Sequence, residues 1–139
     1  MKIGDSASFE KTISEFDVYQ FAGITGDFNP IHINKVEAEQ SVFGERIVHG
    51  MLAGSLLSTV IGMYMPGKGT IYMEQDCKFV SPIKIGDTIK ATVTCEEIIN
   101  FEKRIVKLGN FVTNQDGKTV IEGYSVVKVP KGRIEKSEE

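Results

Sequence analysis

The stretch MLAGSLLSTVIGMYM, residues 51–65, decides the fold that the sequence predicts. Its apolar side chains occupy most sides of a helix, which is typical of a helix enclosed by protein. The stretch is too short to span a bilayer comfortably, and residues such as Gly54 and Ser58 interrupt it. Pro66 and Gly67 follow directly and end it. We therefore expect one buried central helix.

Every segment after Gly69 has the composition and spacing of β-strands. In residues 88–97 apolar side chains alternate with threonine and lysine, which predicts one buried and one exposed face. The other strands are expected at 70–80, 104–113 and 119–129. A helix followed by such strands predicts an α+β architecture, in which one antiparallel sheet curls around the central helix.

The residues before the central helix predict a short strand and two helices. The strand is expected at residues 6–13. Ser14, with an aspartate three residues on, forms a capping box, and Gly26 ends the helix that this box begins. A second capping-box pattern begins at Asn34 and predicts a helix of about two to three turns that stops near Gly44.

Length and composition predict an ordinary globular protein. The 139 residues fit a single domain, which we place at residues 1–130, with a charged tail at 131–139 that is expected to fray. The net charge of −3 argues against a nucleic-acid partner, which needs a basic face. The first residues lack the apolar core of a signal peptide. Cys77 and Cys95 stand alone in strand patterns, as is typical of a reducing compartment. We therefore expect a cytoplasmic protein with no membrane partner.

Residues 26–32, GDFNPIH, place an acid and an imidazole in one short turn. Asp27 and His32 are residue types that commonly serve general acid–base catalysis. The only other histidine, His49, stands directly before the central helix. The histidines and cysteines show no metal-ligand spacing, so no metal ion is expected.

Several segments of the chain resemble the hydratase-2 motif of the MaoC-like family. They are FAGITGDFNPIH at 21–32, IVHGML at 47–52, MPGKG at 65–69 and FVSPIKIGD at 79–87. That family comprises (R)-specific enoyl-CoA hydratases with the hot-dog fold. The resemblance is greatest to the short, single-domain members that supply (R)-3-hydroxyacyl-CoA to polyester synthesis.

The resemblance implies a hydro-lyase that adds water reversibly, with syn geometry, to trans-2-enoyl-CoA. It implies no cofactor, because coenzyme A is part of the acyl-CoA substrate. It also implies a homodimer or higher homo-oligomer, with coenzyme A bound at a subunit boundary.

Hydration of an enoyl thioester needs a base for the water, a proton for the α-carbon and stabilisation of the enolate oxygen. We assign Asp27 as the base and His32 as the partner that orients the water and returns the proton, with the reverse division open. Without the motif, Asp27 would be taken as the cap of a turn against which His32 packs. Gly50 begins the central helix, where free N–H groups can form an oxyanion hole, or it is a simple helix-start glycine. The resemblance assigns Gly50 the first role.

Further residues have supporting roles. Asn29 is expected to secure the turn through bonds to the backbone. Ser58 matches a serine that related hydratases carry near the Asp–His pair, or it bonds to its own helix. His49 is expected to orient the loop or to line the pocket. By their positions in related short-chain enzymes, Ile61 and Val126 are candidates for setting the depth of the acyl pocket, or are ordinary core residues.

Two other functions stay open. A hot-dog acyl-CoA thioesterase would need a carboxylate near the central helix, and residues 51–65 contain neither Asp nor Glu. A non-catalytic acyl-CoA-binding protein would not need Asp27, His32 and Gly50, whose presence favours an enzyme. Four basic side chains are candidates for binding the phosphates of coenzyme A, or are solvated surface charges. They are Lys84, Lys103, Arg104 and Lys107.

Overall fold

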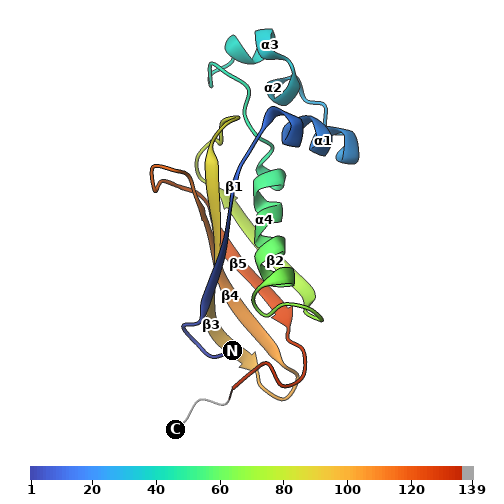
Figure 1. Cartoon of the computed structure of the whole chain (residues 1–139), viewed down its shortest axis with the longest axis vertical. Helices are drawn as coiled ribbons and strands as arrows, with labels where there is room; N and C mark the ends of the chain where they lie inside the picture. Colours follow the sequence, from blue (N-terminus) through green and yellow to red (C-terminus); the bar gives the residue numbers. More distant parts are fainter. Residues whose placement is uncertain (136–139) are drawn as a thin grey trace.

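The computed structural model, which describes residues 1–135, contains five strands and four helices within that part of the chain (Figure 1). In chain order they are β1 (Ser6–Thr12), α1 (Glu15–Thr25), α2 (Pro30–Ile33), α3 (Lys35–Glu39), α4 (Gly50–Met63), β2 (Ile71–Phe79), β3 (Thr88–Asn100), β4 (Ile105–Thr113) and β5 (Thr119–Lys128).

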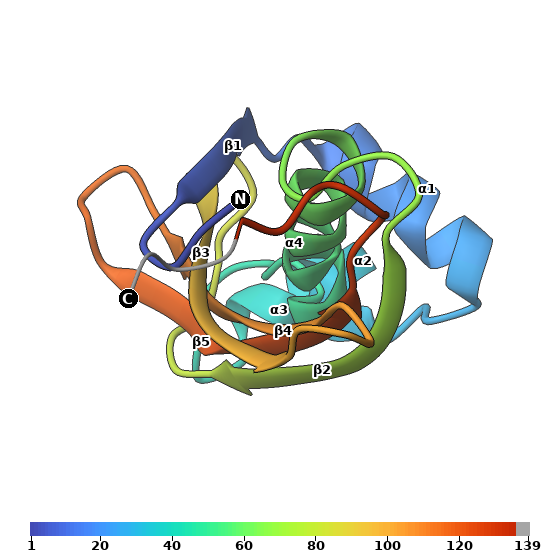
Figure 2. The same ribbon diagram turned by 90° about the horizontal axis from the view of Figure 1, so that it is seen from below.

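The strands form one antiparallel sheet in the order β1-β3-β4-β5-β2, which curves around α4 (Figures 1 and 2). The predicted α+β architecture is therefore confirmed. On β3 the apolar side chains predicted to share one face are all buried, and they pack with α4 in a single core. The residues that α4 buries in this core are Ala53, Leu56, Leu57, Val60 and Ile61.

Helices α1, α2 and α3 lie together at one end of the sheet, beside the first turn of α4 (Figure 1). The capping box that begins α1 is confirmed: the Asp17 N–H donates to the Ser14 hydroxyl at 3.1 Å, and the Ser14 N–H donates to the Asp17 carboxylate at 3.0 Å. Gly26 ends α1 in the left-handed conformation with φ of 81°, which favours glycine.

Helix α3 is shorter than predicted, because it ends at Glu39 rather than near Gly44. The hydroxyl of Ser41 donates to the carbonyl of Ala38 at 2.6 Å and accepts from the N–H of Phe43 at 3.2 Å. These local side-chain bonds replace the backbone bonds of another helical turn. Part of the expected Asp27–His32 turn is also helical, since α2 begins at Pro30.

Helix α4 begins at Gly50 and ends at Met63, two residues before the predicted end. The Met65–Pro66 peptide bond that follows is cis. None of the helices in residues 1–135 is both long enough and apolar enough to cross a membrane.

The first residues of the predicted tail contact the N-terminus. The N-terminal ammonium group donates to the Arg133 carbonyl at 2.6 Å, and the Glu135 N–H donates to the Met1 carbonyl at 2.9 Å. Ile134 packs against the core. Residues 131–135 of the predicted tail therefore contact the N-terminus and the core, and the rest of that tail, 136–139, lies outside the described residues.

Candidate active site

The structure brings Asp27, His32 and His49 together, with one nitrogen or carboxylate oxygen of each within 4.8 Å of the others. The turn after α1 places the first two. The N–H of Asn29 donates to the Asp27 carboxylate at 3.2 Å, and the Asn29 side-chain oxygen accepts from the N–H of Ile31 at 3.2 Å as the N-cap of α2. These bonds hold the Asp27 carboxylate while α2 turns the His32 ring back toward it.

The hydrogen bonding of His32 decides which of its nitrogens is free. Its Nδ1 lies 2.7 Å from the carbonyl oxygen of Ile47. A carbonyl only accepts, so Nδ1 carries the hydrogen and donates it. In the neutral ring Nε2 then has a free lone pair, and it is the atom that can exchange a proton with a bound water or substrate.

His49 contacts both Asp27 and His32. Its Nε2 lies 3.0 Å from the carbonyl oxygen of Asp27, and its ring stacks on His32 with a centroid distance of 3.8 Å. Phe21 packs on the His49 ring at 4.9 Å. The His49 side chain is buried, and its Nδ1 has no hydrogen-bond partner within residues 1–135. His49 therefore fixes the main chain of Asp27 and the plane of the His32 ring at the same time.

The ring geometry favours proton transfer at this cluster over metal binding. The His32 and His49 rings are only 25° from parallel. Because the lone pairs of an imidazole lie in the ring plane, two stacked rings direct them side by side and not toward one point. A tetrahedral zinc site needs converging ligands.

Gly50 is the first residue of α4, and within residues 1–135 its N–H has no hydrogen-bond acceptor. The N–H is therefore free to donate to a ligand at the positive end of the helix dipole. An added Cβ would lie 2.7 Å from ring carbons of Phe79, so a larger residue here would have to displace that half-exposed ring. Glycine leaves this N–H accessible, as an oxyanion hole requires.

Arg46 ties α1 to the segment that leads into α4. Its guanidinium donates to Glu15 Oε1 at 2.7 Å and also to the Tyr19 hydroxyl, which donates to the Ile33 carbonyl at 3.3 Å. The hydrogen bond from Arg46 lowers the pKa of the Glu15 carboxyl below its usual value, with smaller contributions from Tyr19 and the Arg46 charge. Sequence analysis missed this contact, because 31 residues separate its partners and neither lies in a motif.

The remaining predicted site residues lie apart from the cluster. Ser58 is exposed on α4, and within the described residues it makes no hydrogen bond to Asp27 or His32. Ile61 is buried in the core between α4 and the sheet. Val126 shares a face of β5 with Tyr124, on the side of the sheet away from α4. The neighbouring Val127 is the residue that joins Ile61 in the core.

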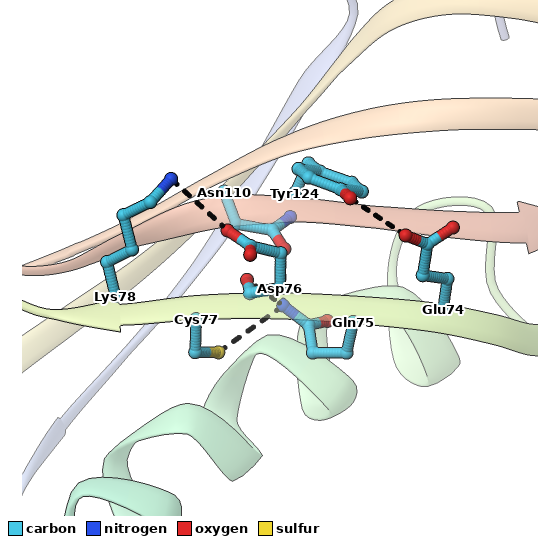
Figure 3. Close-up of polar contacts among 7 residues, drawn as sticks. All are labelled: Glu74, Gln75, Asp76, Cys77, Lys78, Asn110 and Tyr124. Carbon is cyan, nitrogen blue, oxygen red and sulfur yellow. Dashed lines mark hydrogen bonds and ion pairs between the residues drawn. The ribbon is translucent and has the colours of Figure 1, made fainter.

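The side chains of β2 alternate between the two faces of the sheet (Figure 3). Glu74 accepts a hydrogen bond from Tyr124, and Asp76 pairs with Lys78, all on the face away from α4. The face toward α4 carries Gln75 and Cys77, with the Gln75 amide 3.4 Å from the Cys77 sulfur. A hot-dog thioesterase would need a carboxylate near the central helix. The carboxylates of β2 point away from that helix.

Gln75, which is itself exposed, also hydrogen-bonds with two buried polar residues, Ser125 and Asn110, in a network that sequence analysis did not find. The Ser125 hydroxyl lies 2.6 Å from both the Gln75 and the Asn110 side-chain oxygens, and the Gln75 amide donates to Asn110 at 2.9 Å. Ser125 and Asn110 come from two strands whose other inward side chains are mostly apolar, so their pairing could not be inferred from spacing. The network satisfies its own polar groups and lies on the α4 side of the sheet.

An antiparallel sheet wrapped around one central helix is the hot-dog fold. With an acid–imidazole pair beside the free N-terminus of that helix, the chain has the architecture of the hot-dog hydro-lyases. The chain belongs to the MaoC-like domain family, whose model matches residues 2–116.

Relatives and solved structures agree with this assignment. The chain is 48% identical to the (R)-specific enoyl-CoA hydratase of Rhodospirillum rubrum, over 94% of this chain and 89% of the relative. It is 39% identical to the 3-hydroxybutyryl-CoA dehydratase of Methylorubrum extorquens, over 94% and 82%. The structure matches the (R)-hydratase from A. caviae involved in PHA biosynthesis with a TM-score of 0.90 and 35% identity, covering 94% of this chain and 98% of that one.

The arrangement of His49 predicts a large effect on turnover when its hydrogen bond is removed. Phenylalanine at this position keeps a ring between His32 and Phe21 but no longer donates to the Asp27 carbonyl. For the hydration proposed below, we expect His49→Phe to lower kcat by about 10- to 100-fold, because small displacements of catalytic groups are costly. KM should stay within about twofold of wild type.

Steady-state kinetics with thermal unfolding of the same samples checks this prediction. His49→Gln is the matched control, since its amide can still donate to the Asp27 carbonyl, and it should recover part of the loss. A His49→Phe enzyme with wild-type kcat would show that His49 only fills space.

Proposed function

We propose that this protein is an (R)-specific enoyl-CoA hydratase that adds water reversibly to trans-2-enoyl-CoA. The observation that carries the proposal is the close approach of the Asp27 carboxylate and the His32 ring beside the free N–H of Gly50. The family and the named activities of the relatives support the same reaction. Its product, (R)-3-hydroxyacyl-CoA, would suit a polyester synthase.

In the proposed reaction one water lies between Asp27 and His32. Asp27 removes one proton from the water as its oxygen bonds to the β-carbon, and the other water proton stays on the new hydroxyl. The π electrons move toward the thioester, whose oxygen accepts a hydrogen bond from the Gly50 N–H. In this step His32 enters as the imidazolium, with Nδ1–H on the Ile47 carbonyl, and delivers the proton on Nε2 to the α-carbon, which leaves the neutral ring. A later proton transfer from Asp27 to Nε2 of His32 restores both groups.

The proximity of the two residues supports syn addition. Asp27 and His32 come from the same short segment, and their polar atoms lie within 4.8 Å of each other, so the hydroxyl and the proton would reach one face of the double bond. The opposite division of acid and base between the two residues would give the same syn product, because both would face the same side of the substrate. The proposed reaction uses no metal or redox cofactor.

We also propose a homodimer formed through β2. This strand is at the edge of the sheet, and its outer side has no strand partner in the described chain. Ile71, Met73 and Phe79 on β2 and Met51 and Met63 on α4 are exposed. A long edge strand with apolar side chains is a pairing surface, and a two-fold axis lets two copies cover the same surface on each other. Both cysteines are free, which supports the expected cytoplasmic location.

The deciding assay mixes the purified protein with crotonyl-CoA and follows the absorbance of the conjugated enoyl thioester. A hydratase removes this absorbance without releasing free coenzyme A. Release of a free thiol would identify a thioesterase instead. If no reaction occurs at any acyl chain length, the protein binds acyl-CoA without catalysis.

Substitution of Met73 tests the dimer. Met73 is 54% exposed on β2, so Met73→Glu should leave the fold intact but place charges in the proposed interface. We expect sedimentation analysis to show a dimer for the wild type and a monomer for the variant. Val36→Glu, at a comparably exposed position on α3, is the control and should remain dimeric. A dimeric Met73→Glu protein would mean that another surface forms the oligomer.

A further inference from the structure

The end of α2, which carries His32, is hydrogen-bonded to two other segments of the chain. The Ile31 carbonyl accepts from the Ile47 N–H at 3.1 Å, and the His32 ring donates to the Ile47 carbonyl at 2.7 Å. The Ile33 carbonyl accepts from the Tyr19 hydroxyl at 3.3 Å. Helix α2 is therefore held at two points, one before α4 and one on α1.

Arg46 connects these two points. It directly precedes Ile47, and its guanidinium donates to the Tyr19 hydroxyl and, at 2.7 Å, to the Glu15 carboxylate. The guanidinium carbon also lies 5.7 Å from the centre of the Tyr19 ring. The Arg46 side chain is only 16% exposed, whereas that of Glu15 is 54% exposed. A fully solvated ion pair contributes little, but this guanidinium is mostly buried and has two partners on α1.

We propose that Arg46 is a positioning residue for His32, an inference that rests on the proposed function. A tyrosine hydroxyl has one hydrogen to donate. Because Arg46 donates to the Tyr19 oxygen, that hydrogen is directed to the Ile33 carbonyl, and the neighbouring positive charge strengthens the hydroxyl as a donor. Without Arg46 the hydroxyl is free to donate to water or to Glu15, and one of the two points that hold α2 is weakened.

The same side chain joins the two parts of the proposed site. Helix α1 leads into the turn that carries Asp27, and Arg46 belongs to the segment that leads to Gly50. This segment is also bonded to the chain that precedes β3, since the Val48 N–H donates to the Ile83 carbonyl at 2.7 Å. Loss of Arg46 should therefore let α1 and α2 move relative to the N-terminus of α4. Catalysis by positioned groups is sensitive to small displacements of this kind.

Arg46→Met tests the proposal, because methionine keeps an unbranched side chain but loses the bonds to Tyr19 and Glu15. We expect kcat for hydration of crotonyl-CoA to fall by about tenfold or more, with KM within about twofold of wild type. Tyr19→Phe, which removes only the hydroxyl, should cause a similar loss, and the double variant should lose little more than either single variant. Arg133→Met is the matched control, since Arg133 is an exposed arginine near the other end of the chain, and it should keep the wild-type kcat.

NMR spectroscopy of the histidine rings gives a second measurement that needs no turnover. The chain has two histidines, so long-range proton–nitrogen spectra of the wild type and of His49→Phe assign both rings. In the wild type the neutral His32 ring should carry its hydrogen on Nδ1. In Arg46→Met and Tyr19→Phe its signals should shift toward a mixture of the two neutral tautomers. A loss of stability alone would leave the tautomer of the folded protein unchanged.

Some outcomes overturn the proposal. A wild-type kcat in Arg46→Met would show that catalysis does not depend on the guanidinium. A loss of kcat with an unchanged His32 spectrum, or losses that multiply in the double variant, would mean that Arg46 does not act through Tyr19 on His32. If Arg46→Met does not fold, the same two measurements on Tyr19→Phe decide the question. A wild type that hydrates no enoyl-CoA would contradict the proposed function, and the His32 tautomer in the two variants would still test the role of Arg46.

Discussion

Asp27→Asn should lower kcat for hydration of crotonyl-CoA by about 10³- to 10⁴-fold, because general base catalysis contributes up to about that much. The amide cannot take a proton from the water. It keeps an oxygen that can accept the bond from the Asn29 N–H, so the turn and α2 should persist. The loss should therefore appear in kcat, with the unfolding temperature and circular dichroism of the wild type.

The control for this substitution is Asp116→Asn. Asp116 is exposed in the turn between β4 and β5, and its removal changes the net charge by the same amount. It should leave kcat unchanged. An Asp27→Asn enzyme with activity near that of Asp116→Asn would remove Asp27 from the mechanism.

His32→Asn should cause a loss in kcat of about 10³-fold, because its side chain lacks the nitrogen that exchanges the proton. Asparagine is chosen because its amide can replace Nδ1–H as the donor to the Ile47 carbonyl. The variant then separates the proton-transfer role of Nε2 from the structural role of Nδ1. Stopped-flow absorbance of the enoyl thioester measures the chemical step.

His32→Ala is the companion variant. It removes both nitrogens and the ring that stacks on His49, so it should be as inactive as His32→Asn and less stable by a few kcal/mol. If His32→Asn were as active as the wild type, His32 would have a packing role and no role in proton transfer. The comparison therefore distinguishes catalysis from the simple turn-capping interpretation of the same two residues.

The sequence predicted the fold well because its two patterns act over short distances. The apolar stretch at 51–65 and the alternation on β3 each depend on neighbouring residues. The structure has a helix at Gly50–Met63 and one buried face on β3, close to what these patterns predict. The end of α3 was missed because the side chain of Ser41 competes for backbone groups, which a helical pattern does not reveal. Strand β5 illustrates another limit: it has valine at both 126 and 127, so alternation alone cannot tell which one faces α4.

The proximity of Asp27 and His32 could be predicted from the sequence for a similar reason. Asp27 and His32 are five residues apart, and one turn is enough to bring them together. The central place of His49 could not be predicted, because it depends on a bond to the Asp27 carbonyl, 22 residues away, and on stacking with His32. The position of His49 directly before α4 was the only signal of it in the sequence.

The stereochemical course of the reaction tests the central claim most directly. Wild-type protein hydrates crotonyl-CoA in D₂O, and the configuration at both carbons of the product is determined by proton NMR and chiral analysis. With Asp27 and His32 acting on one face, the product should be (R)-3-hydroxybutyryl-CoA with deuterium at the α-carbon, added syn to the hydroxyl. An (S) product, anti addition or release of coenzyme A would contradict the account.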